Sequence, residues 1–405
     1  MLARRAGDTM IAFANRILSL AGLPPAEILR AKAKLAEHVL RRRHLEAGLV
    51  LPMFTEVYVG EEPMHVALFS ATEQTARYLA ALAFRAAIEP SDEIPGLLDQ
   101  AIAAVERAHA LTDTPGVLAR GYLPERRAAE CDFPGQEEQL RQGEGWVWLA
   151  GGHIDTYCAV FFSAAVLHDL CPSFAPRLTP LVCAVLDRWL EHSLTLTDVG
   201  GRPVPDCPTA PGTIPPDRRV VCLQVLQLLC IGHHLTGRPE YLSTYRELAS
   251  DHEYAPTGVP ITLPGLSPKD DVRAFEAYYH LVPCEQDPAL RAAYLQSLRG
   301  KWAKVKGEER VYLDLIGGAV DPEAGFGPEL TDVLLRLEVV KEFPHGGAPD
   351  GQGPQSPGPV PVEQRPPTMF EWGYSPHRTW AAKTLLAPVD YLVAYWMARY
   401  HGALG

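Results

Sequence analysis

The chain has 405 residues, of which 47% are hydrophobic, and a formal net charge of −12 at pH 7. A nucleic-acid partner requires a basic surface that meets phosphate, so this acidic balance argues against one. No run reaches the ~18 uninterrupted apolar residues that a membrane span needs, so we expect no membrane partner either.

The predicted elements are helices of two kinds. Segments such as 155–170 and 220–233 are apolar nearly all round, whereas 28–49 and 180–192 each have one apolar stripe and one charged face. A helix that is apolar on every side must be surrounded by protein, while a striped helix covers the outside. The alternation of the two kinds predicts an inner ring of helices within an outer ring.

Proline and glycine set the limits of the predicted helices. An extra amphipathic helix over 1–22 comes first and is favoured over a signal peptide, although a chain trimmed of its leader would look the same. Outer helices are predicted over 25–48, 93–112, 176–194, 239–250, 287–303 and 327–341. Inner helices are predicted over 66–88, 155–170, 218–235, 270–281, 308–318 and 378–400. This count is that of an all-α (α/α)6 toroid, six inner and six outer helices, and we expect 1–405 to form one such domain.

The long predicted links, 112–154, 195–217, 251–269 and 343–378, each lead from an outer helix into an inner helix. In a ring of helical hairpins such links share one face, and long loops on a rigid scaffold are where sites are built. We therefore expect the site at the N-terminal ends of the inner helices. The stretch 343–368 is rich in Pro and Gly and is expected to form neither helix nor sheet, either as a flap or as a plain surface excursion.

The first candidate for chemistry is the segment 143–157, GEGWVWLAGGHIDTY. Asp155 is at the start of an inner helix, where it either caps the helix or acts with His153 as an acid, base or ligand group. Trp146 and Trp148 are candidate platforms for a sugar ring. Tyr157 is a candidate assisting residue. Two potential ligands do not make a metal site, so we predict no metal.

Two further segments complete the predicted site. In GVLARGYLP, 116–124, Arg120 either clamps a carboxylate or phosphate or pairs with a loop acid, with Tyr122 beside it. In MFEWGYSPHR, 369–378, the predicted site residues are Glu371, Trp372, Tyr374 and His377. These aromatics either line or plug the mouth of the toroid. Glu371 is the predicted partner of Asp155 in a pair of carboxylates, which an inverting glycosidase holds ~6.5–9.5 Å apart.

Other polar residues are assigned structural roles. Asp198, in LTDVGGRPVP, is expected to be a turn residue. His233 and His234 diverge by ~100° on one helix and are no chelating pair. The eight cysteines include no CxxC pair and suit a reducing cytoplasm. No nucleotide-binding, serine-hydrolase, zinc-protease or EF-hand pattern is present, so we expect no cofactor.

Several of these motifs together resemble a known group. GVLARGY, an Asp-Thr-Tyr step that opens an apolar helix with a distal HDL, LTDVGGRPV and the ending MFEWGYSPHR…DYLVAYWMARY are similar to a pattern of bacterial six-hairpin, (α/α)6-barrel proteins. The resemblance covers most of 110–400 and implies the toroid. Related toroids include glycoside hydrolases, polysaccharide lyases, sugar epimerases and a terpenoid dehydratase-isomerase.

The chain departs from this pattern at two places. At 150–153 a Gly-Asp-Thr-Ser run is replaced by Ala-Gly-Gly-His, and the usual glycines are absent from 158–163, whereas Asp155 matches. The first hypothesis is a carbohydrate-active enzyme, a hydrolase or lyase, acting on a saccharide or other small molecule. The alternatives are a dehydratase or isomerase of an apolar or terpenoid alcohol, with Cys158 or the His–Asp pair moving protons, and a binding or scaffold toroid without chemistry.

Overall fold

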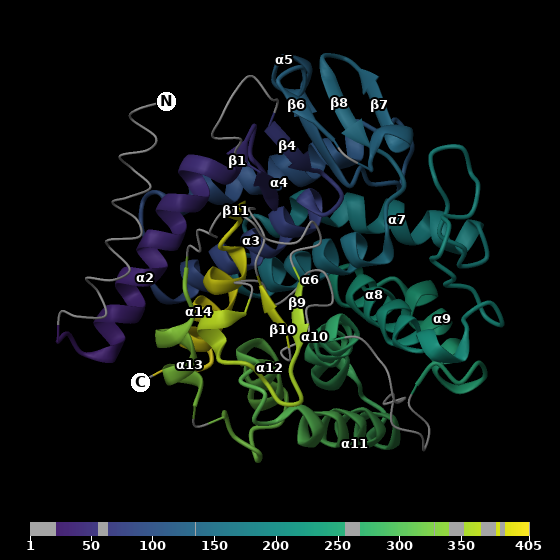
Figure 1. Cartoon of the computed structure of the whole chain (residues 1–405). Coiled ribbons are helices and arrows are strands. Elements are labelled where there is room, and N and C mark those ends of the chain that lie inside the picture. Colours follow the sequence, from purple (N-terminus) through teal and green to yellow (C-terminus); the bar gives the residue numbers. More distant parts are fainter. Residues whose placement is uncertain are drawn as a thin grey trace.

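The structure is a computed structural model that describes residues 22–55, 64–133, 135–255, 268–327, 329–339, 352–365, 378–380 and 385–404. The chain is mostly helical, which confirms the predicted helical class (Figure 1). Short strands also form small sheets, which we did not predict. All but the last residue of the predicted helix over 1–22 lies outside the described residues.

Six helices, which we call the central helices, correspond to the segments predicted to be inner. Their apolar composition explains their burial: α6 is buried from Ile154 to Leu167, and Asp155 is the one charged residue in that stretch. The central helices are α3 (Ala71–Ile88), α6 (Ile154–Leu170), α8 (Val220–Thr236), α10 (Pro268–Cys284), α12 (Val311–Val320) and α14 (Val389–Tyr400).

The segments predicted to be outer are also helical, and we call them the covering helices. A proline stands in the first turn of most of them, where its missing N–H group has no partner to lose. The covering helices are α2 (Pro25–Val39), α4 (Ile94–Ala110), α7 (Thr179–Glu191), α9 (Pro239–Ser250), α11 (Pro288–Val305) and α13 (Leu330–Arg336).

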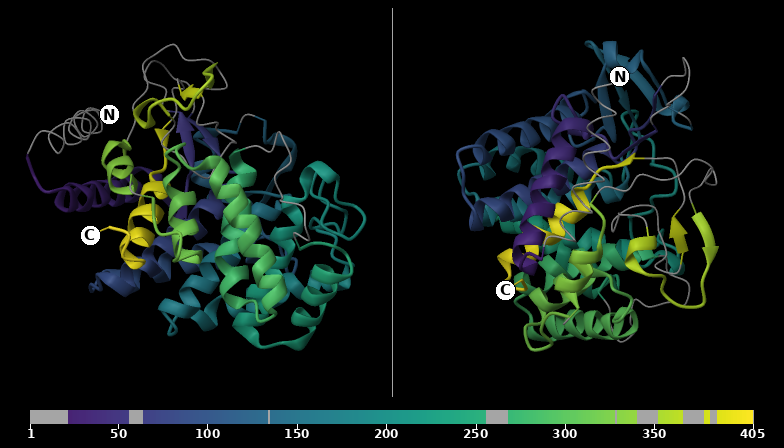
Figure 2. Two further views of the ribbon diagram at one scale, coloured as in Figure 1. Left: turned by 90° about the horizontal axis from the view of Figure 1, so that it is seen from below. Right: turned by 60° about the vertical axis from the view of Figure 1, so that its left-hand side comes forward.

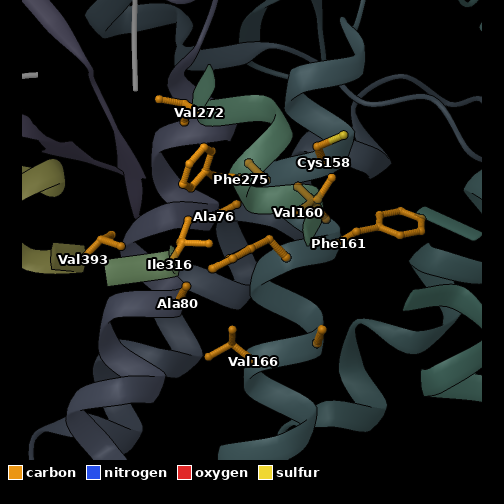
Figure 3. Packing of buried hydrophobic residues seen from close by; sticks show 14 of the residues in the cluster. Ala76, Ala80, Cys158, Val160, Phe161, Val166, Val272, Phe275, Ile316 and Val393 are labelled. Carbon is orange, nitrogen blue, oxygen red and sulfur yellow. The ribbon is translucent and has the colours of Figure 1, made fainter. Parts of the chain in front are cut away.

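The central helices pack in chain order. Helix α3 contacts α6, α6 contacts α8, α8 contacts α10, α10 contacts α12, α12 contacts α14, and α14 contacts α3. Their side chains meet in one large core, in which Ala76, Val160, Phe275, Ile316 and Val393 come from five different helices (Figure 3). Among the covering helices, α4 contacts α3, α9 contacts α8, and α2 contacts α14.

The long link between α4 and α6 folds into an antiparallel sheet with the strand order β5 (Gly121–Pro124), β8 (Trp146–Leu149), β7 (Leu140–Gly143). This sheet stands at one edge of the helical body (Figures 1 and 2). A second sheet joins distant segments in the order β11 (Leu385–Leu386), β3 (Met53–Thr55), β4 (Met64–Ala67), β6 (Cys131–Asp132).

Several predicted helices are shorter than expected. Among the described residues, the helix predicted over 327–341 is limited to Leu330–Arg336, and the one predicted over 66–88 begins at Ala71. The prediction over 25–48 is wrong after residue 44: α2 gives way to one π-helical turn, Leu40–His44, and then to a hairpin whose turn residues Ala47 and Gly48 have positive φ. The prediction over 378–400 is wrong at its start. Residues 378–380 form β10, and the final helix begins after Pro388, which fits a helix start.

The Pro- and Gly-rich stretch 343–368 is not free of regular structure, so that prediction is corrected where the chain is described. Strand β9 (Gln352–Gln355) pairs with β10 (Arg378–Trp380), and Val362–Gln364 forms a 3-10 turn. The buried Arg365 guanidinium anchors this stretch by donating to the carbonyls of Val360 (2.7 Å) and Glu308 (2.6 Å). Val362 of the same stretch is buried in the large core, so packing and side-chain hydrogen bonds both hold this segment.

The structure also bears on membrane spans and on the cysteines. None of the helices in these ranges has both the length and the apolar composition of a membrane span. All eight cysteines are free thiols. Cys158, Cys207 and Cys222 are buried, and burial raises the pKa of each thiol.

Candidate functional site

A cavity of about 280 Å³ opens where three central helices begin. Helices α3, α6 and α10 direct their N-terminal ends toward it, and the segment before β5 closes one side. Each helix N-terminus carries a partial positive charge, so this convergence favours anionic groups. The lining residues are Phe69, Ser70, Glu73, Arg120, His153, Asp155, Thr156, Lys269 and Arg273.

Asp155 lies at the centre of the polar contacts of this cavity and is only 5% exposed. Arg273 on α10 binds its carboxylate with two hydrogen bonds, from Nε to Oδ1 (2.8 Å) and from Nη2 to Oδ2 (2.6 Å). Nζ of Lys269 is 3.0 Å from Oδ2, and Nε2 of Gln224 on α8 donates to Oδ1 at 3.0 Å. One carboxylate therefore ties α6 to α8 and α10.

These contacts fix the charge of Asp155. Burial by itself would raise the pKa of this carboxyl, but the positive charges of Lys269 and Arg273 outweigh burial and hold the pKa well below its usual range. The same contacts raise the pKa of Arg273 and of Lys269, although burial opposes both. Asp155 is therefore ionised at neutral pH. Of the roles of acid, base or ligand that the sequence left open, that of general acid suits it least.

The capping interpretation of Asp155 is also corrected. The N-cap of α6 is His153, whose Nδ1 accepts the backbone N–H of Asp155 at 3.4 Å. The same Nδ1 lies 3.3 Å from Oδ2 of Asp155. An unprotonated Nδ1 accepts from the amide, whereas a protonated Nδ1 donates to the carboxylate and leaves Nε2 as a base. The His153 side chain is 32% exposed and faces the cavity.

Arg120 is held in the wall of the cavity by the strand segment that carries it. Its backbone N–H donates to Leu149 and its carbonyl accepts from Thr72, while Nε donates to the carbonyl of Phe69 at 2.8 Å. The next residue must be glycine, because a Cβ on Gly121 would lie 2.4 Å from the Leu68 carbonyl oxygen. Sequence reasoning predicted Arg120 as a clamp, and the structure places it at the cavity.

A buried charge network below the cavity was not predicted. Arg77 on α3 binds Glu73 (Nη2–Oε1, 3.0 Å) and also Glu276 on α10. Tyr312 on α12 donates to Glu276 at 2.9 Å. Burial raises the pKa of Glu276, and Arg77 opposes that rise. The spacing of Glu73 and Arg77, four residues apart on an otherwise apolar helix, is the signal that could have revealed it.

The predicted aromatic platforms lie elsewhere. Tyr122 is fully buried and donates to the Ala104 carbonyl at 3.1 Å. The Trp146 ring meets the Tyr122 ring edge-on, with centroids 5.3 Å apart, and Arg107 lies over Trp146 at 4.8 Å. Trp148 is buried in the same apolar cluster, which packs the β5–β8 strands against their neighbours. None of the three lines the cavity as it is described.

Tyr157 is likewise part of the packing. Its hydroxyl accepts the backbone N–H of Leu118 at 3.2 Å, and burial raises its pKa to about 12. The hydroxyl also approaches Gly152, where any side chain would crowd it. Tyr157 therefore fixes the segments on either side of the cavity. It is absent from the cavity lining described here.

The remaining predicted residues, Glu371, Trp372, Tyr374 and His377, lie outside the described residues. The separation of the Asp155 and Glu371 carboxyl groups consequently stays a prediction. Asp198 is confirmed as a turn residue, since its Oδ1 accepts the backbone N–H groups of Gly200 and Arg202.

Comparison with known proteins supplies no assignment for this site. No protein-family model matches the sequence, and a search of curated proteins found no match.

Proposed function

We propose that the chain is a carbohydrate-active enzyme built on an (α/α)6 toroid, and that its cavity takes a sugar bearing a carboxylate. The toroid is supported by the order of the central helices, each of which contacts the next until α14 meets α3. It is supported further by the covering helices, which alternate with the central ones along the chain.

One observation carries the proposed substrate class. Arg120, Lys269 and Arg273 reach the cavity beside the N-terminal ends of three helices. Guanidinium groups and helix N-termini both recognise carboxylates. Three protein anions already occupy part of this positive environment: Asp155, Asp270 at 2.6 Å from Arg273, and Glu73 in the lining. A substrate carboxylate is proposed to enter on the side of Arg120 and Lys269.

The chemistry that fits such a substrate best is β-elimination. In this step Nε2 of His153 takes the proton from the carbon next to the substrate carboxylate, and the bond to the leaving sugar oxygen breaks. The electron pair becomes a carbon–carbon double bond, and the imidazolium returns the proton to the leaving oxygen. Cations near the carboxylate stabilise the charge that develops on it.

Asp155 is then a positioning residue. Its carboxylate holds Lys269 and Arg273. In the reactive state it also accepts a proton carried on His153 Nδ1, and the cap hydrogen bond from the Asp155 amide to that nitrogen is then given up. Hydrolysis by a carboxyl pair is less well supported, because Arg273, Lys269 and Gln224 already engage both oxygens of the Asp155 carboxylate, which would otherwise activate a water. The charged lining also favours an acidic sugar over an apolar alcohol.

The test uses the full chain with acidic oligosaccharides and their carboxyl-reduced counterparts. We expect binding by calorimetry of the acidic form alone, and an ultraviolet signal from the unsaturated product. Arg120→Ala should weaken binding roughly tenfold or more, as loss of a charged hydrogen bond does. Arg141→Ala, an exposed arginine on β7, is the matched control. Equal binding of both sugar forms would contradict the proposal.

A binding protein without chemistry is the second candidate, and the extensive pairing of Asp155 favours it. His153→Gln separates the two. In an enzyme this variant keeps its affinity for the acidic sugar and loses turnover. If the unaltered chain binds the acidic sugar and forms no unsaturated or hydrolysed product, the protein is a binder.

A further inference from the structure

A second group of polar side chains lies at the C-terminal ends of α6 and α8. His168 and Asp169 come from the last turn of α6, and His234 from the last turn of α8. Nδ1 of His168 is 3.0 Å from Oδ1 of Asp169, and Nε2 of His234 is 2.8 Å from the same oxygen. We call these residues the His–Asp–His cluster.

The cluster has the composition and spacing of a metal-binding set. One ligand atom from each residue lies within 4.8 Å of the other two. Imidazole nitrogen and carboxylate oxygen bind Zn²⁺ at ~2.0–2.2 Å, so ligand atoms around one ion stand ~3–3.5 Å apart. The two hydrogen bonds to Asp169 are slightly shorter than that. A metal would displace the protons of these hydrogen bonds, and the imidazoles would move slightly away from Asp169. The two imidazole nitrogens, which lie within 4.8 Å of each other, would settle ~3–3.5 Å apart.

The chemistry of the cluster also suits a cation. A carboxylate oxygen of Asp169 lies between two imidazole nitrogens, and both kinds of atom are ligands of divalent transition-metal ions. All three side chains are partly exposed, so an ion reaches them from solvent.

An independent observation comes from the cavity next to the cluster. Asp169 and His234 form part of the wall of this second cavity, which has a volume of about 170 Å³. His280 lines the same cavity, is 8% exposed, and its Nε2 has no hydrogen-bond partner among the described residues. A buried polar atom without a partner is rare in proteins and requires an explanation. Burial lowers the pKa of His280 to about 3, so the ring is a neutral imidazole with a lone pair to offer.

We propose that His168, Asp169 and His234 bind one divalent transition-metal ion of the zinc class, with the remaining coordination position facing the cavity that His280 lines. Three protein ligands with one open position are typical of catalytic zinc sites, whereas structural sites are closed by a fourth protein ligand. The proposal does not depend on the proposed sugar site, which lies at the N-terminal ends of α3, α6 and α10.

The experiment titrates Zn²⁺ into the full chain after chelator treatment and removal of any histidine tag. Calorimetry should give one ion per chain. His168→Ala and His234→Gln should each weaken binding by at least about tenfold, because even loss of an outer-shell partner costs ~10–100-fold. The His234 variant keeps a donor to Asp169, so it preserves the hydrogen bond while it removes the imidazole.

His252→Ala is the matched control. It removes a partly exposed histidine that lies 3.6 Å from Glu247 without a second imidazole, and Zn²⁺ binding should not change. Thermal unfolding provides a second measurement for variants that are less stable than the unaltered chain, because it compares each variant with and without Zn²⁺. Zn²⁺ should raise the Tm of the unaltered chain and of His252→Ala, but not that of the cluster variants. Absence of saturable binding, or one-to-one binding that survives the loss of both His168 and His234, would overturn the proposal.

Discussion

Arg273 on α10 and Asp155 on α6 are joined by two hydrogen bonds, of 2.8 and 2.6 Å, although 118 positions separate them in the sequence. This bidentate pair is the principal electrostatic link between two central helices at the candidate site. Lys269 and Gln224 bring the same carboxylate into contact with further parts of α10 and α8.

Asp155→Asn should destabilise the fold. The amide cannot neutralise Lys269 and Arg273, and removal of one partner from a buried ion pair costs roughly 3 kcal/mol. The measurement is urea unfolding at neutral pH. The control is Asp198→Asn, which alters an exposed pair with Arg202 and should cost less than about 1 kcal/mol. If the two variants lost similar free energies of unfolding, the buried ion pair of Asp155 would stabilise the fold no more than the exposed pair of Asp198.

The same residue predicts a pH dependence. Its pKa is lower in the folded chain than the ordinary value of 3.8, so the unfolded state binds its proton first as the pH falls. The stabilisation by Asp155 is therefore complete above that ordinary value and is lost as the pH falls below it. Urea unfolding of the unaltered chain and of Asp155→Asn at several pH values should give stabilities that converge in strong acid. If the difference in stability between the two proteins stayed constant down to strong acid, Asp155 would not have the lowered pKa assigned to it.

Arg77→Met should unfold the chain more easily at neutral pH, by about 3–5 kcal/mol, because it leaves Glu73 and Glu276 buried without their cation. Part of the loss should be recovered as the pH is lowered, since burial raises the pKa of Glu276 and a neutral carboxyl needs no cation. The combined variant Glu73→Gln, Arg77→Met, Glu276→Gln tests this explanation. It should regain most of the stability at neutral pH in a denaturation experiment.

Gly121→Ala should both destabilise the chain and weaken ligand binding. The new Cβ would approach the Leu68 carbonyl oxygen to 2.4 Å and the Ala71 Cβ to 2.8 Å, so the strand must move, and with it Arg120. Overpacking of this kind costs ~1–3 kcal/mol. Gly143→Ala, in the same sheet, places its Cβ in open space and serves as the control. Equal thermal stability of the two variants would remove the steric argument.

The helices could be predicted because their cause is local. Long apolar segments such as 155–170 must be enclosed, and proline and glycine mark where they end, so the order of central and covering helices follows from the sequence. The strands could not be found in the same way. The parallel pairing of His65 with Asp132 joins segments that are far apart in the chain, and no local pattern specifies such a partner.

The candidate site was predictable in position but not in its contacts. The link lengths and the His153–Asp155 segment pointed to the start of α6, where the cavity lies. The partners of Asp155, which determine its charge, come from a helix more than a hundred residues later. The strand formed by Trp-Val-Trp-Leu was not predicted, and it places both tryptophans away from the described cavity lining. Trp146 and Trp148, two positions apart in β8, share one face of the sheet.

Helix α6 carries Asp155 at its beginning and the His168–Asp169 pair at its end, 14 residues or about 21 Å further along. Its interior has no proline or glycine at which it would bend, so it behaves as a stiff rod. A displacement of this rod along its axis would alter both the cavity at Asp155 and the His–Asp–His cluster at once. The effect of a substitution near one end of α6 should therefore also be measured at the site near its other end.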